Sequence, residues 1–372
     1  MADETGASPE ILVVGGGQSG LAVGYFLRRL NRPFAILDAE PAPGGAWRHG
    51  WESLRLFSPA EASSLPGWKL PPAGEGGYPG RDHVIDYLAR YEARYGLPVE
   101  RPMRVSGLRR GRDGGLVLET DRGERRAPAV VAATGTWSAP YVPDIPGRRG
   151  FRGLQVHSAR YRDPQPFAGK QVLVVGGGNS GAQILAEVAP VAAEAIWVTL
   201  APPTFLPDEV DGRVLFTEAN RRFHEGAADT GYSLGDIVAV PSVRAARAAG
   251  RLASVRPFRR FTPDGAGVEW ADGTATPVDA VIWCTGFRPA TGLLAPLGIV
   301  DAEGRVATDG TRAVEVPGLW LAGYGSWTGF ASATLFGITR SARTTAQEIG
   351  AWLALPPAAR TAAAWRRLEA AA

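Results

Sequence analysis

Residues 171–188, QVLVVGGGNSGAQILAEV, nearly repeat residues 10–27, EILVVGGGQSGLAVGYFL. Each stretch begins with a run of apolar residues, which is typical of a strand buried on both faces of a parallel sheet. Each then passes through Gly-Gly-Gly-x-Ser-Gly into a helical pattern. A strand, a glycine turn and a helix in this order begin a dinucleotide-binding βαβ unit. The sequence therefore predicts an α/β fold with two Rossmann-like domains.

The order of the remaining patterns places the second unit inside the first. Two further buried strands, Ala127–Gly135 and Asp279–Gly286, end in the similar segments ATG and CTG. A late strand at Gly318–Gly325 and a helix from about 333 to 355 return the chain to the first unit. We expect one discontinuous domain at 1–165 and 285–372 and an inserted domain at 166–284.

The first turn has the spacing Gly15-x-Gly17-x-x-Gly20 and is followed by Asp38, 21 residues after Gly17, at the end of the next strand. Glycine at these positions permits a tight turn and a close approach of the backbone to a pyrophosphate, which the helix N-terminus stabilises. An acid at the strand end accepts hydrogen bonds from ribose hydroxyls. We expect Gly15, Gly17, Ser19, Gly20 and Asp38 to bind a dinucleotide.

The second turn, Gly176-x-Gly178-x-x-Gly181, differs at its strand end. Thr199 stands where the acid would be, and no Asp or Glu follows before Asp208. An acid would repel a 2′-phosphate, so its absence favours NADPH over NADH. No arginine adjoins Thr199, and Arg213 is the nearest one downstream. We expect Gly176, Gly178, Asn179, Ser180, Gly181 and Thr199 to bind the nicotinamide cofactor; neither turn has the G-x-S-x-G pattern of a hydrolase.

Composition excludes several other functions. Among 372 residues the formal net charge is only +3 and like charges form no long run, which disfavours nucleic-acid binding. The single cysteine, Cys284, excludes an internal disulfide or a redox-active cysteine pair, and the four scattered histidines offer no metal site. The acidic, polar start and the lack of a long apolar run predict a cytoplasmic protein without an integral membrane segment.

The segment between the two units carries a more specific pattern. FRGLQVHSARY at 151–161 has Phe151, Gly153, His157 and Tyr161 in the spacing FxGxxxHxxx(Y/W). It resembles the fingerprint of the class B flavoprotein monooxygenases, in which this motif lies just before the NADPH turn. Within the class the chain most resembles YUCCA-like proteins and, more closely, ArsO-type flavin monooxygenases. ESLRLFSPAEASSLPGW at 52–68 and FLPDEVDGRVLF at 205–216 are among the segments that carry this likeness.

The resemblance implies FAD at the first turn, NADPH at the second, and further cofactor contacts. GGAW at 44–47 resembles the flavin-lining segment of the family, and residues 318–342 resemble its C-terminal flavin segment. The contacts implied in this way are Gly45, Trp47, Val105, Thr134, Gly135, Gly323, Thr285 and Gly286. Candidates for the walls of the flavin and substrate pocket are Trp47, Trp51, Trp68, Trp137 and Trp327. Residues 202–251 interrupt the second unit and are a candidate lid.

The family's activity would be NADPH-driven oxygenation of a small-molecule heteroatom or carbonyl substrate through a flavin C4a-(hydro)peroxide. The expected partners are then that substrate and O2. The sequence does not decide whether the protein forms a homodimer. The resemblance implies no catalytic side chain, because the flavin carries the chemistry, and His157 is a fingerprint residue of the family. Phe57 and Ser58 stand where many members have a peroxide-stabilising Asn. An NADPH oxidase or flavin reductase, without oxygenation, is therefore the alternative, followed by a non-catalytic flavin-binding redox sensor.

Overall fold

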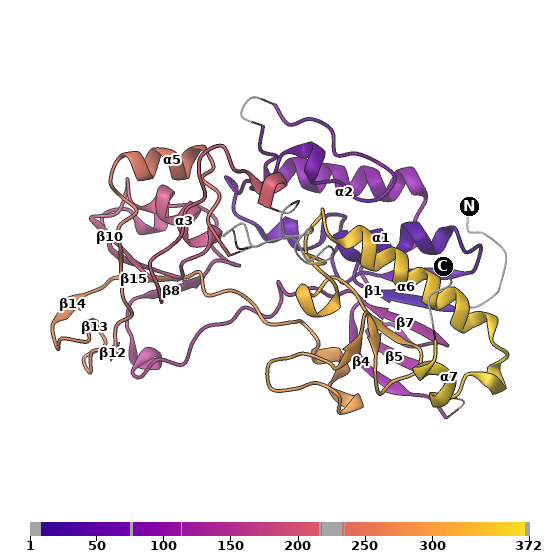
Figure 1. Cartoon of the computed structure of the whole chain (residues 1–372). Coiled ribbons are helices and arrows are strands. Elements are labelled where there is room, and N and C mark those ends of the chain that lie inside the picture. The colour runs from indigo at the N-terminus through magenta and orange to yellow at the C-terminus, as the bar shows by residue number, and fades with distance from the viewer. Residues whose placement is uncertain are drawn as a thin grey trace.

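The computed structural model describes residues 9–74, 77–112, 114–215, 217, 233 and 235–368. It has two lobes, each built on a parallel sheet, and the chain passes between them twice (Figure 1). No helix in these residues has the length and apolar character needed to cross a bilayer. The fold class predicted from the two glycine turns is confirmed.

The first lobe contains a seven-stranded sheet with β1 near its centre. Its strands, in spatial order, are β16 (Thr308–Asp309), β17 (Arg312–Ala313), β18 (Leu319–Leu321), β7 (Ala129–Ala132), β1 (Ile11–Val14), β2 (Phe34–Leu37) and β3 (Val99–Glu100). The strands from β18 to β3 run parallel. All four β1 residues are buried, as expected for a strand covered on both faces.

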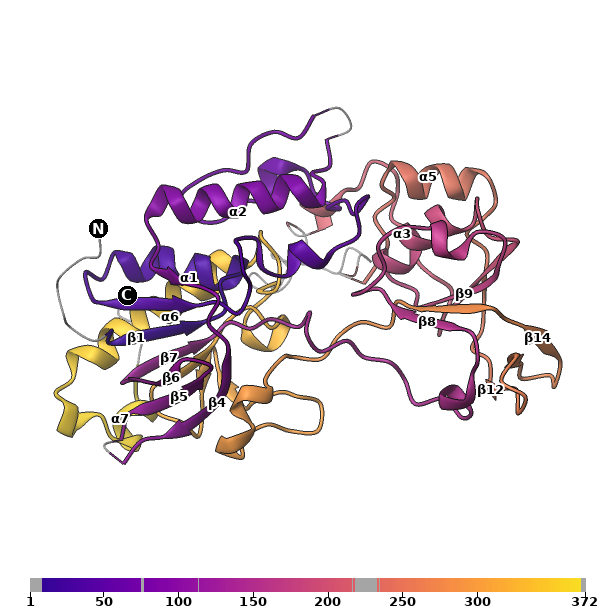
Figure 2. The ribbon, with the colours of Figure 1, turned by 180° about the vertical axis from the view of Figure 1, so that it is seen from behind.

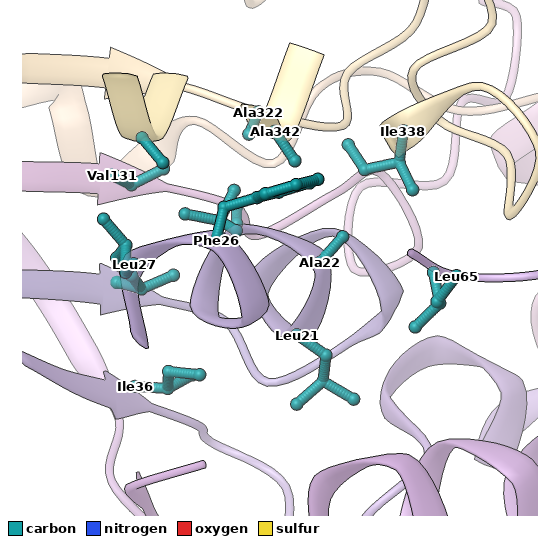
Figure 3. Packing of buried hydrophobic residues seen from close by; sticks show 14 of the residues in the cluster. Leu21, Ala22, Phe26, Leu27, Ile36, Leu65, Val131, Ala322, Ile338 and Ala342 are labelled. Atoms are coloured by element: carbon teal, nitrogen blue, oxygen red, sulfur yellow. The ribbon is translucent and has the colours of Figure 1, made fainter. Parts of the chain in front are cut away.

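Helices α1 (Gln18–Arg28), α2 (Arg81–Tyr95) and α6 (Ile338–Ala354) belong to this lobe, together with α7 (Ala362–Arg366). Figure 3 shows α1 directing Ala22 and Phe26 toward Ala342 and Ile338 of α6. A three-stranded antiparallel sheet joins the same lobe: β4 (Val105–Arg110), β5 (Leu116–Thr120) and β6 (Gly123–Ala127). The first glycine turn thus lies between the seven-stranded sheet and the packed pair of α1 and α6.

Helix α6 begins later than the sequence pattern predicts, at Ile338 instead of about 333. The chain turns sharply first, because Ala331 has a positive φ of 50° and a Cβ on Gly337 would lie 2.3 Å from the Ala331 carbonyl oxygen. A run of turns therefore occupies the predicted first turn of the helix, and it brings Ala333 to the cavity described below.

The second lobe contains a five-stranded, wholly parallel sheet in the order β11 (Ser254–Val255), β10 (Glu194–Val198), β9 (Gln171–Val175), β15 (Ala280–Trp283) and β8 (Leu154–His157). Helices α3 (Asn179–Val188) and α5 (Pro241–Ala248) lie on one face (Figure 2). A small antiparallel sheet of β12 (Arg260–Phe261), β13 (Gly267–Glu269) and β14 (Ala275–Pro277) extends this lobe. β8 pairs with β15 in the second sheet. The predicted domain boundary at 165 lies after β8 and would place this strand in the first domain.

The two chain crossings between the lobes run side by side. Tyr141 N–H donates to the Gly286 carbonyl (2.9 Å), and Arg288 N–H donates to the Ala139 carbonyl (2.8 Å). Both crossings directly follow the ATG and CTG segments. The lobes are thus joined by a paired, hydrogen-bonded connection next to both glycine turns.

Candidate functional site

The two glycine turns have the same internal construction. A Cβ on Gly15 would lie 2.4 Å from the Ala133 carbonyl oxygen, and one on Gly176 would lie 2.1 Å from that of Cys284. Both glycines also have strongly positive φ, 113° and 130°. The ATG and CTG segments therefore supply the carbonyls that pack beneath the two turns, which explains why they are similar.

The third glycine of each turn is also fixed by the protein itself. A Cβ on Gly20 would lie 1.9 Å from the Gly15 carbonyl oxygen, and one on Gly181 would lie 2.2 Å from that of Gly176. Protein packing alone thus accounts for the first and third glycines of both turns.

The middle glycine of each turn is different, because no protein atom requires it. A Cβ on Gly17 would find only the Cα of Gly45, at 3.9 Å, and one on Gly178 would find nothing within 4 Å. Gly17 and Gly178 are the N-cap residues of α1 and α3, where backbone N–H groups are free to bind an anion. Both turns therefore fit a pyrophosphate that approaches the backbone at the middle glycine.

A cavity of about 800 Å³ extends from the first turn to the second. It reaches Ser180 at the start of α3. The predicted site residues that line it are Gly15, Gly17, Ser19, Asp38, Gly45, Trp47, Val105, Thr134, Gly135, Ser180 and Gly323. Trp51 and Trp137 also line it, whereas Trp68 packs on Tyr87 of α2 and Trp327 on Tyr324. The space thus runs from the first turn to Ser180, which alone of residues 176–181 lines it.

Several lining residues were missed by the sequence analysis. They are Gln18, Glu40, Arg104, Leu293 and Ala333, together with Pro289 and Ala290. Gln18 follows the middle glycine directly, and its side chain accepts from the Trp47 indole N–H (2.9 Å) and donates to the Ala333 carbonyl (2.6 Å). Its position in the turn was a usable signal, whereas Leu293 and Ala290 belong to no pattern visible in the sequence.

Asp38 is held by a buried ion-pair network. The Arg101 guanidinium donates to the Asp38 carboxylate (3.1 Å) and binds both carboxylate oxygens of Glu92, at 2.7 and 2.8 Å. Asp38 is only 4% exposed and the Arg101 side chain 12%. A buried carboxylate needs such a partner, since desolvation would otherwise cost several kcal/mol, on the order estimated for buried ions. Arg101 therefore fixes the orientation of Asp38 at the edge of the cavity.

The GGAW and C-terminal segments close on the first turn through backbone and hydroxyl contacts. Gly44 and Gly45 have positive φ, and a Cβ on Gly45 would lie 2.7 Å from the Gly17 Cα. The Tyr324 hydroxyl bonds the Thr134 hydroxyl (2.6 Å), and burial raises the pKa of Tyr324 to about 12. The tyrosine therefore stays neutral and ties the ATG segment to the C-terminal segment.

The fingerprint 151–161 is built into the second lobe and does not point into the cavity. A Cβ on Gly153 would lie 2.4 Å from the Asp279 carbonyl oxygen, and Phe151 packs on Phe261. His157 ends β8, where its Nε2 lies 3.0 Å from the Gly286 carbonyl oxygen and its Nδ1 accepts from the Ala159 N–H. These partners require a neutral ring with the proton on Nε2. His157 thus anchors the second chain crossing.

The same histidine should make the stability of the protein depend on pH. Burial lowers the pKa of His157, with the Gly286 carbonyl opposing that shift. Below the free-histidine pKa of about 6.5 the unfolded chain gains a proton here that the folded chain does not. The free energy of unfolding therefore decreases as the pH is lowered. His157→Gln should lose this dependence. Denaturant midpoints measured about one pH unit above and below 6.5 test it; equal pH dependence in both proteins would contradict the prediction.

Residues of both lobes meet beside the second turn. Glu187 of α3 accepts from the Ser53 hydroxyl and from the Tyr161 hydroxyl (3.1 Å). Gln183, one turn earlier, exchanges hydrogen bonds with the backbone of Arg55 (3.4 and 3.5 Å). Burial raises the pKa of Glu187. The segment that follows Trp47 is therefore docked on α3, which places the cavity wall of the first lobe against the second turn.

The other predicted residues of the second turn do not line the cavity. Asn179 uses its side chain to bond the backbone of Asp236 and Val238, and Thr285 donates to the Tyr141 carbonyl. Gly286 receives the bonds of the crossing described above. Thr199 is 2% exposed, and its hydroxyl has no hydrogen-bond partner in the described part of the chain. The candidate lid at 202–251 falls partly outside the described residues.

Comparisons with known proteins agree with this architecture. Residues 12–229 match the family model described as pyridine nucleotide-disulphide oxidoreductase. The structure of a flavin-containing monooxygenase from Stenotrophomonas maltophilia is 51% identical, covers 93% of this chain and 99% of its own, and superposes with a TM-score of 0.85. An uncharacterised CzcO-like oxidoreductase from Geobacillus kaustophilus (strain HTA426) is 32% identical over 80% of this chain and 85% of its own. Indole-3-pyruvate monooxygenase YUCCA1 from Oryza sativa subsp. japonica is 28% identical over 92% and 91%.

Proposed function

Because the chain belongs to the pyridine nucleotide-disulphide oxidoreductase family and is a flavin-dependent monooxygenase within it, we propose that it holds FAD at the first glycine turn and NADPH at the second. We further propose that it transfers one atom of O2 to a heteroatom or carbonyl group of a small molecule. The reaction would consume NADPH, a proton, O2 and the substrate, and would yield NADP+, water and the oxygenated product. Its single cysteine does not allow the paired-cysteine chemistry of a disulphide reductase.

The observation that carries this proposal is the cavity that runs from the first turn to Ser180 of the second. Hydride transfer requires the reacting atoms to lie about 3–3.5 Å apart. Two separate dinucleotide sites would not bring the nicotinamide to the flavin, whereas a space that includes both Gly17 and Ser180 allows the two rings to meet.

The residues of this chain would bind and orient the cofactors and exclude water. The N-terminus of α1 and Asp38 would hold FAD at its pyrophosphate and ribose, and the N-terminus of α3 would hold the NADPH pyrophosphate. When bound, FAD supplies the ability to accept a hydride and to react with O2. Trp47 and Trp137 would shield the meeting point from solvent.

The proposal is tested by the stoichiometry of turnover. We expect a thioether or a ketone to be oxygenated with one NADPH consumed per product, and little H2O2 to appear. Both substrates should be assayed, because the thioether tests oxygenation of a heteroatom and the ketone tests oxygenation of a carbonyl compound. If one H2O2 is formed for each NADPH oxidised with both substrates, the proposed oxygenation is wrong.

An NADPH oxidase is the second candidate, and one observation favours it. Neither Phe57 nor Ser58 lines the cavity. The Ser58 hydroxyl bonds that of Ser63 (2.8 Å), and the Phe57 carbonyl accepts from Gly212 N–H (2.7 Å). No amide side chain therefore enters the cavity from this stretch. The H2O2 yield in the same assay distinguishes the two functions.

Removing Arg101 should weaken FAD binding. Arg101→Met would leave Asp38 without its charged partner, and we expect the Kd for FAD to rise about tenfold, as for the loss of a charged hydrogen bond. Titrating the deflavinated protein with FAD measures this Kd. Arg125→Met is the matched control, since Arg125 makes a similar two-point bond to Glu100 without touching Asp38. Equal FAD affinity in the two variants would contradict the prediction.

A further inference from the structure

An arginine that is distant in the sequence, Arg256, lies at the strand end beside the second turn. β10 and β11 run parallel with Trp197 opposite Ser254 and Val198 opposite Val255. Thr199 N–H then donates to the Val255 carbonyl (3.0 Å). Continuing this register by one residue places Arg256 opposite Thr199. An arginine thus adjoins Thr199 after all, supplied by the neighbouring strand.

Arg256 lies on the same face of the sheet as the second turn. Side chains alternate along a strand, so Arg256 shares a face with Ser254, and its guanidinium donates to the Ser254 hydroxyl (2.7 Å). Trp197, opposite Ser254, donates its indole N–H to the Gly176 carbonyl (2.8 Å). The face that carries Arg256 is therefore the one on which the glycine turn and α3 lie.

The guanidinium of Arg256 has no acidic partner among the residues that the structure describes. Arg256 is exposed, and no carboxylate in the described part of the chain pairs with it. Arg213, which the sequence analysis noted, lies 4.0 Å from the Asp211 carboxylate, next to Gly212 and its bond to Phe57 in the first lobe. Arg247 pairs with Asp208. Arg256 is thus the better candidate of the three for an incoming anion.

Two neighbouring residues complete a subsite at this strand end. The Thr199 hydroxyl is buried without a partner among the described residues, and a Cβ on Gly177 of the turn would lie 3.4 Å from the Thr199 side chain. Leu200, the next residue, is 91% exposed. An unsatisfied buried hydroxyl needs a hydrogen-bonding partner, and an exposed leucine offers an apolar surface without repelling a negative charge.

We propose that Arg256 is the residue that recognises the 2′-phosphate of NADPH, with the Thr199 hydroxyl bonding the adjacent adenosine ribose. This inference rests on the proposed binding of NADPH at the second turn. A guanidinium presents several donors to the oxygens of one phosphate, so it would favour the 2′-phosphorylated cofactor over NADH.

The test measures the Kd values of NADP+ and NAD+ for the FAD-loaded enzyme by calorimetry. Arg256→Ala should weaken NADP+ about tenfold, the loss expected for one charged hydrogen-bonding group, and should leave NAD+ within about twofold. Arg256→Lys should recover part of the NADP+ affinity. Arg247 lies on α5 and Arg259 follows β11. Arg247→Ala and Arg259→Ala should change the Kd of neither NADP+ nor NAD+.

The outcomes separate this inference from the proposed function. An equal loss of NADP+ and NAD+ affinity in Arg256→Ala, or no loss, would overturn the role of Arg256. A selective loss of NADP+ in Arg247→Ala would assign the phosphate to that residue instead. If wild-type enzyme bound neither dinucleotide, or bound NADP+ equally well after Gly178→Ala, the site at the second turn would itself be wrong.

Discussion

Gly178→Ala should strongly impair NADPH-driven reduction of the flavin while the protein keeps its fold and its FAD. The added methyl group would occupy the open side of the turn, where the pyrophosphate is expected to approach the backbone. We expect NADP+ affinity to fall on the order of 100-fold, or about 2.8 kcal/mol at 1.4 kcal/mol per factor of ten. Calorimetric titration of NADP+ and anaerobic reduction by NADPH measure the effect.

The fold should tolerate this substitution for local reasons. Gly178 has φ of −99°, which any residue adopts, and the new Cβ would find no protein atom within 4 Å. Only the N-cap preference for glycine over alanine is lost, at about 0.5–1 kcal/mol. Wild-type NADP+ affinity in Gly178→Ala would show that the turn does not hold the dinucleotide.

Gly17→Ala should give a folded protein that is isolated without FAD. Gly17 has φ of −80°, and its new Cβ would meet only the Gly45 Cα at an ordinary 3.9 Å. FAD would lose its closest backbone approach at the helix N-terminus, so we expect a loss of affinity on the order of 100-fold here as well. The visible flavin absorbance of the purified protein reports the occupancy.

The two variants serve as controls for each other. Gly17→Ala should retain the second turn, and its NADP+ binding should persist, whereas Gly178→Ala should retain FAD. Gly20→Ala is a useful contrast, because its Cβ would clash with the Gly15 carbonyl and should destabilise the protein. If Gly17→Ala retained FAD fully, or lost NADP+ instead of FAD, the assignment of cofactors to turns would be wrong.

The sequence predicted the features that depend on short-range pattern. The strand–turn–helix order at both turns and the continuous apolar strands are local, and the structure has them at nearly the predicted residues. The similarity of the ATG and CTG segments is visible in the sequence, but the reason for that similarity is not. Only the structure shows that the carbonyls of Ala133 and Cys284 pack under Gly15 and Gly176.

Pairings between distant segments could not be predicted. Asp38 was found from its spacing, yet its partner Arg101 directly follows β3, 63 residues further along the chain. Arg213 was named because it follows Thr199 in the chain, whereas strand pairing brings Arg256 to Thr199. Periodicity records which face of an element is buried, and it contains no information about which element lies alongside.

Anaerobic mixing of the FAD-loaded enzyme with NADPH tests most directly whether the two dinucleotides meet in one cavity. We predict that the visible flavin absorbance is lost with one NADPH per flavin. We also predict that NADPH deuterated at the transferred position slows this loss, because the hydride passes directly between the two rings. A flavin that stays oxidised while NADP+ and FAD are both bound would contradict the account.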